Sequence, residues 1–158
     1  MRQRPIQAIL FATLMTAALP SHCLGIGECD VTASTLPFGN YNPASGSPLT
    51  TTGTITVSCG VSIFVLPSWT ITLSMGNGTY VARRMVSGLN NLSYNIFRNA
   101  GLTEVWGNGS GGTFAIQDAA LLVLGTYQKA YTMYGRIPAL QDVAPGSYTD
   151  TITVTINY

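Results

Sequence analysis

The chain has 158 residues, of which 46% are hydrophobic and only 8% are charged, and its formal net charge is +1. This length fits one domain, and the hydrophobic content is enough for a core, which excludes a globally disordered chain. The near-neutral charge excludes a basic surface for nucleic acid, so no nucleic-acid partner is expected.

Residues 1–25 have the pattern of a secretory signal peptide. Arg2 and Arg4 precede an apolar run at residues 9–19, which is too short to span a bilayer. Pro20 ends the run, and cleavage is placed near Gly25, with the exact position left open. We therefore expect an exported protein whose mature domain comprises residues 26–158, without a transmembrane segment.

Removal of this leader would leave two cysteines, Cys29 and Cys59. An exported protein reaches a compartment where disulfides form, and a bridge over this separation would contribute about 3–4 kcal/mol by loop-closure reasoning. The alternative is a pair of free buried thiols. If the two residues bond, the strands that carry them are neighbours or face each other across the core.

Two alternating segments after the leader predict β-strands. The first lies within residues 29–38 and ends at Pro37, and residues 53–59 form the second, with Ile55 and Val57 inward on the parity of Cys59. Residues 39–47 between them are rich in Gly, Asn, Pro and Ser, which is typical of a turn.

Two short runs are almost wholly apolar, at residues 61–66 and 119–124. One interpretation of the first run is a buried strand extension or a loop packed on the core. The other is an exposed apolar loop that contacts a surface. Under the second interpretation, the candidate contact residues of both runs are Ile63, Phe64, Val65, Leu66, Leu121, Leu122 and Leu124.

Further strands are predicted from alternation at residues 69–75, 92–98 and 131–137, with a weak one at 113–116. In the first of these, Trp69, Ile71, Leu73 and Met75 share one face, and in the second Leu92, Tyr94 and Ile96 point inward. Glycines at 76 and 78 indicate a turn. No apolar pattern of helical period and length occurs after the leader. Short strands with frequent turns favour an all-β sandwich.

Residues 147–158 carry the cleanest strand pattern. Large apolar or aromatic residues share one parity and hydroxyl residues share the other, which buries a single face only in a strand. Asp150 interrupts the apolar face near its start. A strand of this quality needs neighbours along its edges. Its apolar face comprises Tyr148, Ile152, Val154, Ile156 and Tyr158.

Catalytic and metal-binding chemistry is not indicated. The only histidine, His22, lies in the predicted leader, which removes the base of a Ser-His-Asp or Cys-His system and the usual zinc ligands. The six acidic residues stand in no recognisable motif. We predict no enzyme activity, no cofactor and no metal.

Several short motifs occur in a characteristic order along the chain. They are Cys29 with Val31, Phe38-Gly39-x-Tyr41, Gly53 to Cys59, Arg84-Met85, Leu92 to Arg98, Trp106-Gly107, Tyr134 to Pro138 and Gly146 to Tyr158. Together they resemble the spore coat protein U domain family, which includes subunits of archaic chaperone–usher pili.

The resemblance implies an incomplete immunoglobulin-like β-sandwich that lacks its final strand. A periplasmic chaperone would lend a strand, and at the outer-membrane usher the extension of a neighbouring subunit would replace it, which is β-strand addition. It also implies a disulfide between Cys29 and Cys59. The acceptor groove would be lined by Ile152, Val154, Ile156 and Tyr158.

The expected role is therefore a structural subunit of a surface pilus, with a part in adhesion or biofilm formation. Cleavage at Gly25 would leave three residues before Cys29, which span about 10 Å at 3.3 Å per residue and cannot fill a groove. We thus expect a strand acceptor near the fibre tip. The alternatives are a secreted coat protein outside pili and a carbohydrate-binding module whose stacking platform uses Trp69, Trp106 and the eight tyrosines.

Overall fold

The structure is a computed structural model that describes residues 26–61, 68–120 and 125–158. None of the described segments forms a helix long and apolar enough to cross a membrane. The strands in these ranges are β1 (Ile26–Ala33), β2 (Leu49–Val61), β3 (Ser68–Leu73), β4 (Asn77–Thr79), β5 (Ala82–Ser87), β6 (Asn90–Phe97), β7 (Ile116–Ala119), β8 (Gly125–Ile137) and β9 (Val154–Asn157).

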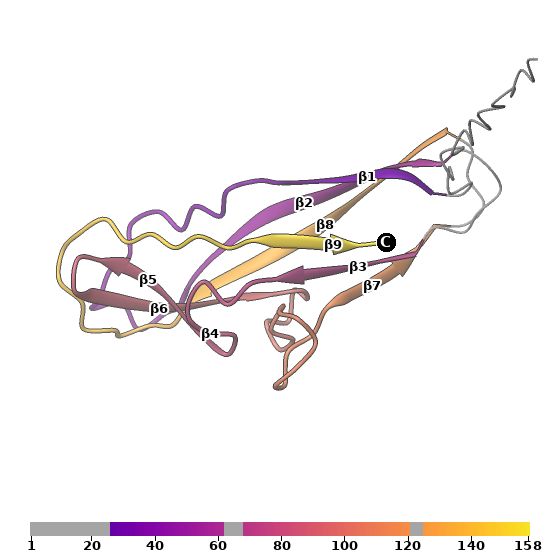
Figure 1. The fold of residues 1–158 in the computed structure, drawn as a ribbon. Coiled ribbons are helices and arrows are strands. Elements are labelled where there is room, and N and C mark those ends of the chain that lie inside the picture. The colour runs from indigo at the N-terminus through magenta and orange to yellow at the C-terminus, as the bar shows by residue number, and fades with distance from the viewer. Residues whose placement is uncertain (1–25, 62–67, 121–124) are drawn as a thin grey trace, which may run out of the picture.

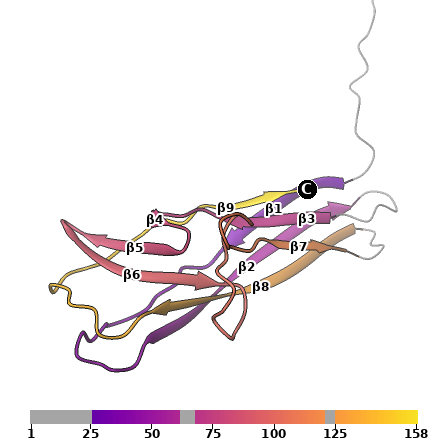
Figure 2. The ribbon, with the colours of Figure 1, turned by 90° about the horizontal axis from the view of Figure 1, so that it is seen from below.

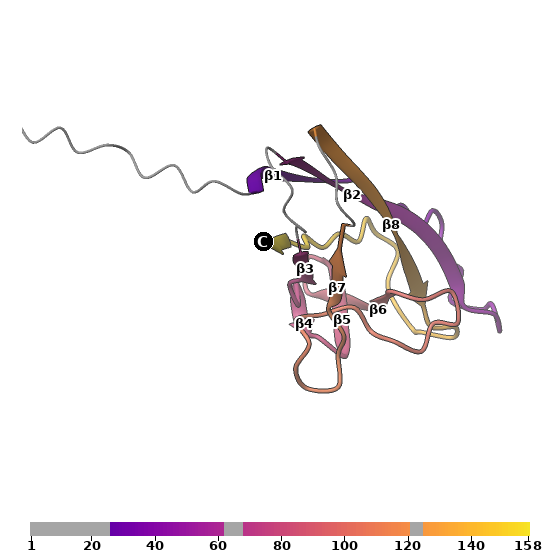
Figure 3. The same ribbon diagram turned by 90° about the vertical axis from the view of Figure 1, so that its right-hand side faces the viewer.

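The strands form two curled antiparallel sheets. The larger has the order β1-β2-β8-β6-β5-β4 and the smaller has the order β7-β3-β9. Seen end-on, β9 lies beside β3 and below β1 (Figure 3). The predicted all-β class is confirmed, and the two sheets enclose one core.

The core contains the inward positions that alternation identifies. Ile55, Val57, Cys59 and Ile71 are fully buried, and Trp69, Leu73, Leu92, Tyr94 and Ile96 are nearly so. Met75 is the exception: it lies after the end of β3 with 48% of its surface exposed, so it does not share the buried face predicted for Trp69, Ile71 and Leu73.

The strands β2 and β8 pair over their whole length, from Leu49 opposite Ile137 to Val61 opposite Gly125 (Figure 2). Both extend beyond the predicted strands at residues 53–59 and 131–137. Polar residues at their ends weaken the alternation, but each strand supplies the other with a continuous hydrogen-bonding partner.

Three local predictions are wrong. The first strand ends at Ala33 rather than at Pro37, and the weak strand at 113–116 occurs instead as β7. The turn expected at residues 76–78 lies instead at Tyr80 and Val81, between β4 and β5, which form a hairpin that was not predicted.

The segment of residues 147–158 belongs to both sheets. Thr149 exchanges backbone hydrogen bonds with Val86 of β5, whereas β9 pairs with β3. The chain must cross from one sheet to the other in between. The predicted continuous strand is therefore reduced to a bridge at Thr149 and the short strand β9.

Candidate binding groove

One long seam of the sandwich is open. The strands β1 and β9 are each the outermost strand of their sheet, and each pairs on one edge only. Their Cα atoms approach within 8 Å, yet the two strands are not hydrogen-bonded to each other. Beyond them, the segment after β1 and the segment before β9 run alongside each other (Figure 1).

Two adjoining hollows lie between these segments, with volumes of about 680 and 400 Å³. Residues 33–43, here called the first wall, bound them on one side, and residues 143–154, the second wall, bound them on the other. Both hollows share Leu36, Pro37, Phe38, Met85 and Tyr148, so they form one continuous groove.

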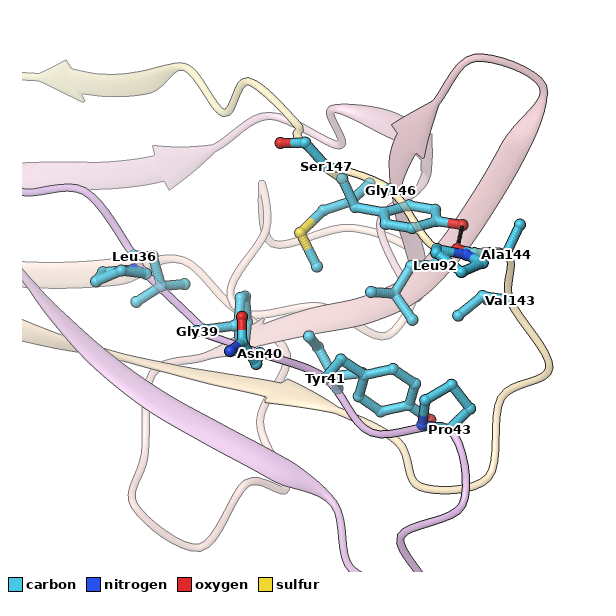
Figure 4. Close-up of a pocket in the computed structure, with 16 residues that line it drawn as sticks. Leu36, Gly39, Asn40, Tyr41, Pro43, Leu92, Val143, Ala144, Gly146 and Ser147 are labelled. Carbon is cyan, nitrogen blue, oxygen red and sulfur yellow. Dashed lines mark hydrogen bonds between the residues drawn. The ribbon is translucent and has the colours of Figure 1, made fainter.

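The floor of the groove is apolar core. Figure 4 shows Tyr41, Leu92 and Val143 around the larger hollow. The floor residues of both hollows come from β5, β6 and β8, and all are at most 8% exposed. They are Met85, Leu92, Tyr94, Ile96, Met133 and Ile137.

Two strand glycines make room for the first wall. A Cβ at Gly135 would come within 2.7 Å of Phe38, and one at Gly53 would come within 3.1 Å of Leu36. Glycine within a strand typically marks such a close approach. The missing side chains allow Leu36 and Phe38 to lie directly on the large sheet.

Hydrogen bonds fasten the first wall to the large sheet. Ser34 N donates to Thr54 O at 2.9 Å, and Thr51 Oγ1 donates to Pro37 O at 2.7 Å. Further along, Tyr41 Oη donates to Pro138 O at 3.0 Å. The first wall is thus anchored from β2 and from the segment after β8.

Asp150 fastens the second wall where it crosses between the sheets. Its Oδ1 accepts hydrogen bonds from the N and Nδ2 atoms of Asn77 and from Thr151 N, and its Oδ2 accepts one from Tyr94 Oη at 2.7 Å. Gly76, with φ of 57°, leaves the space that this carboxylate occupies. Asp150 is therefore a fixed part of the groove rather than an unexplained break in the apolar pattern.

Tyr94 contacts both walls. Its ring meets Phe38 of the first wall edge-on, with centroids 5.8 Å apart, and its hydroxyl reaches Asp150 of the second wall. Burial, followed by the hydrogen bond to Asp150, raises the pKa of Tyr94. The hydroxyl therefore stays protonated and remains a donor at physiological pH.

Beneath the second wall, Arg83 is fully buried. Its guanidinium donates to Asn95 Oδ1 at 2.7 Å, to Ser74 O at 2.7 Å and to Trp106 O at 2.8 Å. Desolvation by burial lowers the pKa of Arg83. The arginine ties β5 and β6 to the ends of two loops, and sequence patterns gave no sign of this role.

The predicted groove residues fall into two groups. Ile152 and Val154 line the smaller hollow, and Ile156 packs against the core from β9. Tyr158 is 54% exposed and lines a separate shallow hollow beside Thr70 and the small sheet.

The candidate surface-contact residues lie outside the described residues. The strand ends that flank them are described: Val61 pairs with Gly125, and Ser68 pairs with Ala119. The strand ends on either side of the two apolar runs are therefore neighbours. Their residues are Ile63, Phe64, Val65, Leu66, Leu121, Leu122 and Leu124.

The disulfide between Cys29 and Cys59 is present, which confirms that prediction. The two residues are direct partners on β1 and β2, with Cα atoms 4.1 Å apart. The bridge therefore fixes β1, which has a hydrogen-bonded neighbour on one edge only, to the interior of the sheet.

Neither a metal site nor a carbohydrate-stacking platform on the two tryptophans is supported by the described residues. Among residues 26–61, 68–120 and 125–158, no group of three or more His, Cys, Asp or Glu side chains is placed to hold a metal. Trp69 and Trp106 are 2% and 0% exposed, so a stacking platform built on these two residues is excluded.

A sequence model of the Spore Coat Protein U domain matches residues 15–155. The chain belongs to the Spore Coat Protein U domain family. Protein U of Myxococcus xanthus is 29% identical to this member of the family over 152 residues, which cover 84% of the chain and 78% of that relative. The resemblance inferred from the motifs is thus confirmed, and the family is one of structural proteins rather than enzymes.

A solved structure shows the same fold as this Spore Coat Protein U domain. It is the pre-assembly complex of the chaperone CsuC with the tip adhesion subunit CsuE, from archaic chaperone–usher Csu pili of Acinetobacter baumannii. The TM-score is 0.51 at 23% identity, over 83% of this chain. The chain spans only 39% of the length of the matched one. This likeness establishes a pilin-like β-sandwich.

Sequence reasoning placed the groove beside residues 152–158 but missed its other components. The first wall is irregular after Ala33, so no periodicity marks it. Tyr94 was recognised only as a core residue. A usable signal did exist in the glycines of β2 and β8, because Gly53 and Gly135 stand on inward positions of otherwise regular strands.

Proposed function

We propose that this protein is a structural subunit of a surface pilus, assembled by the chaperone–usher route through donor-strand complementation. Its groove would accept a strand, first from a periplasmic chaperone and then from a neighbouring subunit at the outer-membrane usher. The observation that carries the proposal is the open seam, with two unpaired strand edges beside an apolar groove.

An extended peptide fits this seam chemically. Unpaired backbone groups on β1 and β9 offer hydrogen bonds, and the floor residues offer apolar contacts to alternate side chains. A folded globular partner would fit the groove less well than an extended peptide, because walls bound the groove on both sides. The same unpaired edges would promote aggregation of the uncovered subunit, which accounts for a chaperone.

The position of β1 supports a subunit that accepts a strand but does not donate one. The strand β1 already includes Ile26 in the large sheet, so a donor segment would have to precede it. Removal of residues 1–25 as a signal peptide would leave no such segment, which favours a position near the fibre tip. N-terminal sequencing of the mature protein tests this step, and a mature end well before Ile26 would contradict it.

Adhesion is assigned to the two apolar runs, whose flanking strand ends are neighbours. Replacing Phe64 and Leu122 with Ser should reduce attachment of cells to an apolar surface while pilus assembly continues. The matched control is Leu89→Ser, because Leu89 is 98% exposed in the β5–β6 turn, far along the chain from either run. Equal attachment by all three strains would refute the assignment.

Co-expression with the cognate chaperone tests the central proposal. The mature domain should be recovered as a one-to-one complex with the chaperone, and without the chaperone it should aggregate or be degraded. Ile152→Asp and Val154→Asp place charges in the groove wall and should abolish the complex. Thr153→Asp, on the exposed parity of the same segment, is the control.

A second candidate is a secreted coat protein that uses this domain outside pili. The match to Protein U at 29% identity, against 23% for the pilus structure, favours it. Recovery of a stable, protease-resistant monomer without any chaperone would support the coat protein over the pilus subunit.

A further inference from the structure

We propose that Tyr94 sets the width of the groove by joining its two walls, and thereby limits the size of the donor side chain that fits above it. This inference rests on the proposed acceptor function and adds a specificity-determining residue to it. Tyr94 acts here as a positioning residue, because it would shape the site through the walls.

The first step is the position of Tyr94 in the groove. It stands on the inward face of β6, lines the smaller hollow and is 6% exposed. Its β5 neighbour is Arg83, which is fully buried and fixed by three carbonyl or amide oxygens. The ring therefore projects from a rigid base.

The second step is that Tyr94 holds each wall by a different interaction. The edge-on contact with Phe38 holds the first wall, and such aromatic pairs contribute about 0.5–1.5 kcal/mol beyond their buried area. The 2.7 Å hydrogen bond to Asp150 holds the second wall, and its acceptor is a carboxylate, which strengthens the bond.

The third step is that Asp150 anchors the middle of the crossing between the sheets. One end is held at Thr149, which pairs with Val86 of β5, and the other at Thr153, which exchanges two hydrogen bonds of 2.9 Å with Ser74. Between these ends, Asp150 supplies the attachment through Asn77 and Tyr94. Loss of the Tyr94 hydroxyl would release the side of Asp150 that faces the groove.

The fourth step is the shape of the groove beside Tyr94. Phe38, Met85 and Tyr148 line both hollows, so they lie where the two hollows join. An inserted strand presents alternate side chains toward the floor. The one that lies nearest Tyr94 and Phe38 has to fit between the walls that Tyr94 holds.

Amide hydrogen exchange tests whether Tyr94 holds the second wall when no donor strand is present. The sample is dilute mature domain, freshly refolded after denaturing release from its chaperone complex. Tyr94→Phe should speed exchange in residues 150–152 at least about threefold and leave residues 34–38 and β2 unchanged, because local openings follow local contacts. Phe38→Leu should speed exchange in residues 34–38 and leave residues 150–152 unchanged. Tyr134→Phe is the control, since Tyr134 pairs with exposed Thr52 on the outer face. If Tyr94→Phe speeds amide exchange equally in all segments, or in none, then Tyr94 does not hold the second wall.

A peptide scan tests the specificity. The probes are synthetic peptides of about 12 residues, which span roughly 40 Å as a strand, with alternating Val and Thr, and with each Val replaced in turn by Ala or by Phe. We compare the two peptides that carry Ala or Phe at the same position. For one central position of the peptide, the wild-type domain should bind the Ala form at least about tenfold more tightly than the Phe form, as pocket discrimination typically permits.

Tyr94→Phe should lower this preference to below about threefold, while Tyr134→Phe keeps it. An unchanged preference in Tyr94→Phe would overturn the specificity role. Failure of the wild-type domain to bind any peptide would refute the acceptor function, and the exchange measurement would still decide whether Tyr94 joins the walls.

Discussion

The two long seams of the sandwich are built in opposite ways. At the seam between β7 and β8, a polar chain closes the gap: Trp69 Nε1 donates to Tyr131 Oη, which donates to Asp118 Oδ2, and Lys129 forms an ion pair with the same carboxylate. At the seam between β1 and β9, no strand pairing or ion pair within the described ranges joins the edges.

The difference shows how the chain manages its strand edges. At the closed seam, Lys129 stands on the inward parity of β8, opposite Val57, and forms an ion pair with Asp118 of β7. Inward charges discourage pairing with another chain. The open seam is lined by apolar residues such as Met133, Ile152 and Val154, which is the lining that the proposed strand acceptance requires.

Among the changes proposed for the two seams, loss of the disulfide is expected to lower the free energy of unfolding most. Cys29→Ser with Cys59→Ser should lower the free energy of unfolding by about 3–4 kcal/mol, because the bridge closes a loop of 30 residues. The bridge also holds β1, one edge of the open seam. Denaturant unfolding measures the loss, and the reduced wild type should match the variant. A loss below about 1 kcal/mol would show that β1 is held by other contacts.

Gly76→Ala should damage the second wall of the open seam. A Cβ at Gly76 would collide with Asp150, and φ of 57° adds backbone strain, so we expect a loss of about 2–3 kcal/mol together with weaker strand capture. Thermal unfolding and chaperone pull-down measure the two effects.

Gly88→Ala is the matched control for this change. Gly88 has φ of 58°, but nothing lies within 4 Å of its would-be Cβ, so only the strain of about 1–2 kcal/mol applies. Strand capture should be normal in this variant. Equal losses of capture in both glycine variants would mean that Asp150 does not shape the groove.

Asp118→Asn should weaken the closed seam alone. The change removes the ion pair to Lys129 and one acceptor for Tyr131, and we expect a loss of about 1 kcal/mol. Strand capture should not change, because the altered residue lies on the opposite seam. Asp142→Asn, at an exposed position, is the control. Reduced capture in Asp118→Asn would show that the two seams are coupled.

The sequence could predict the fold class and the buried face of most strands, since alternation in β2, β3 and β6 directly encodes which side chains face the core. The disulfide was implied by the family resemblance. The groove could be predicted only on the side of residues 152–154. Asp150 disrupts the alternation that identifies strands, and its partners Asn77 and Tyr94 are 73 and 56 positions away. Such long-range polar contacts leave no periodic trace in the sequence.

The smallest expected effect is the pH dependence of the stability that the ion pair of the closed seam provides. Burial alone would raise the pKa of Asp118, but the hydrogen bonds from Lys129 and Tyr131 outweigh it, so the pKa lies below its ordinary value of 3.8. The hydrogen bond to Asp118 raises the pKa of Lys129 above 10.5. The stabilisation by Asp118 is thus complete above pH 3.8 and is lost as pH falls through the lowered pKa.

The contribution of Lys129 has the opposite sign. It is complete below pH 10.5 and is lost as pH rises through the raised pKa. The difference in melting temperature between wild type and Asp118→Asn should therefore be constant between these limits and shrink outside them. Gly88→Ala is the control, because an added Cβ there meets nothing within 4 Å, so its deficit should stay the same across the range. A deficit of Asp118→Asn that persists at pH 2 would mean that packing, rather than charge, closes the seam.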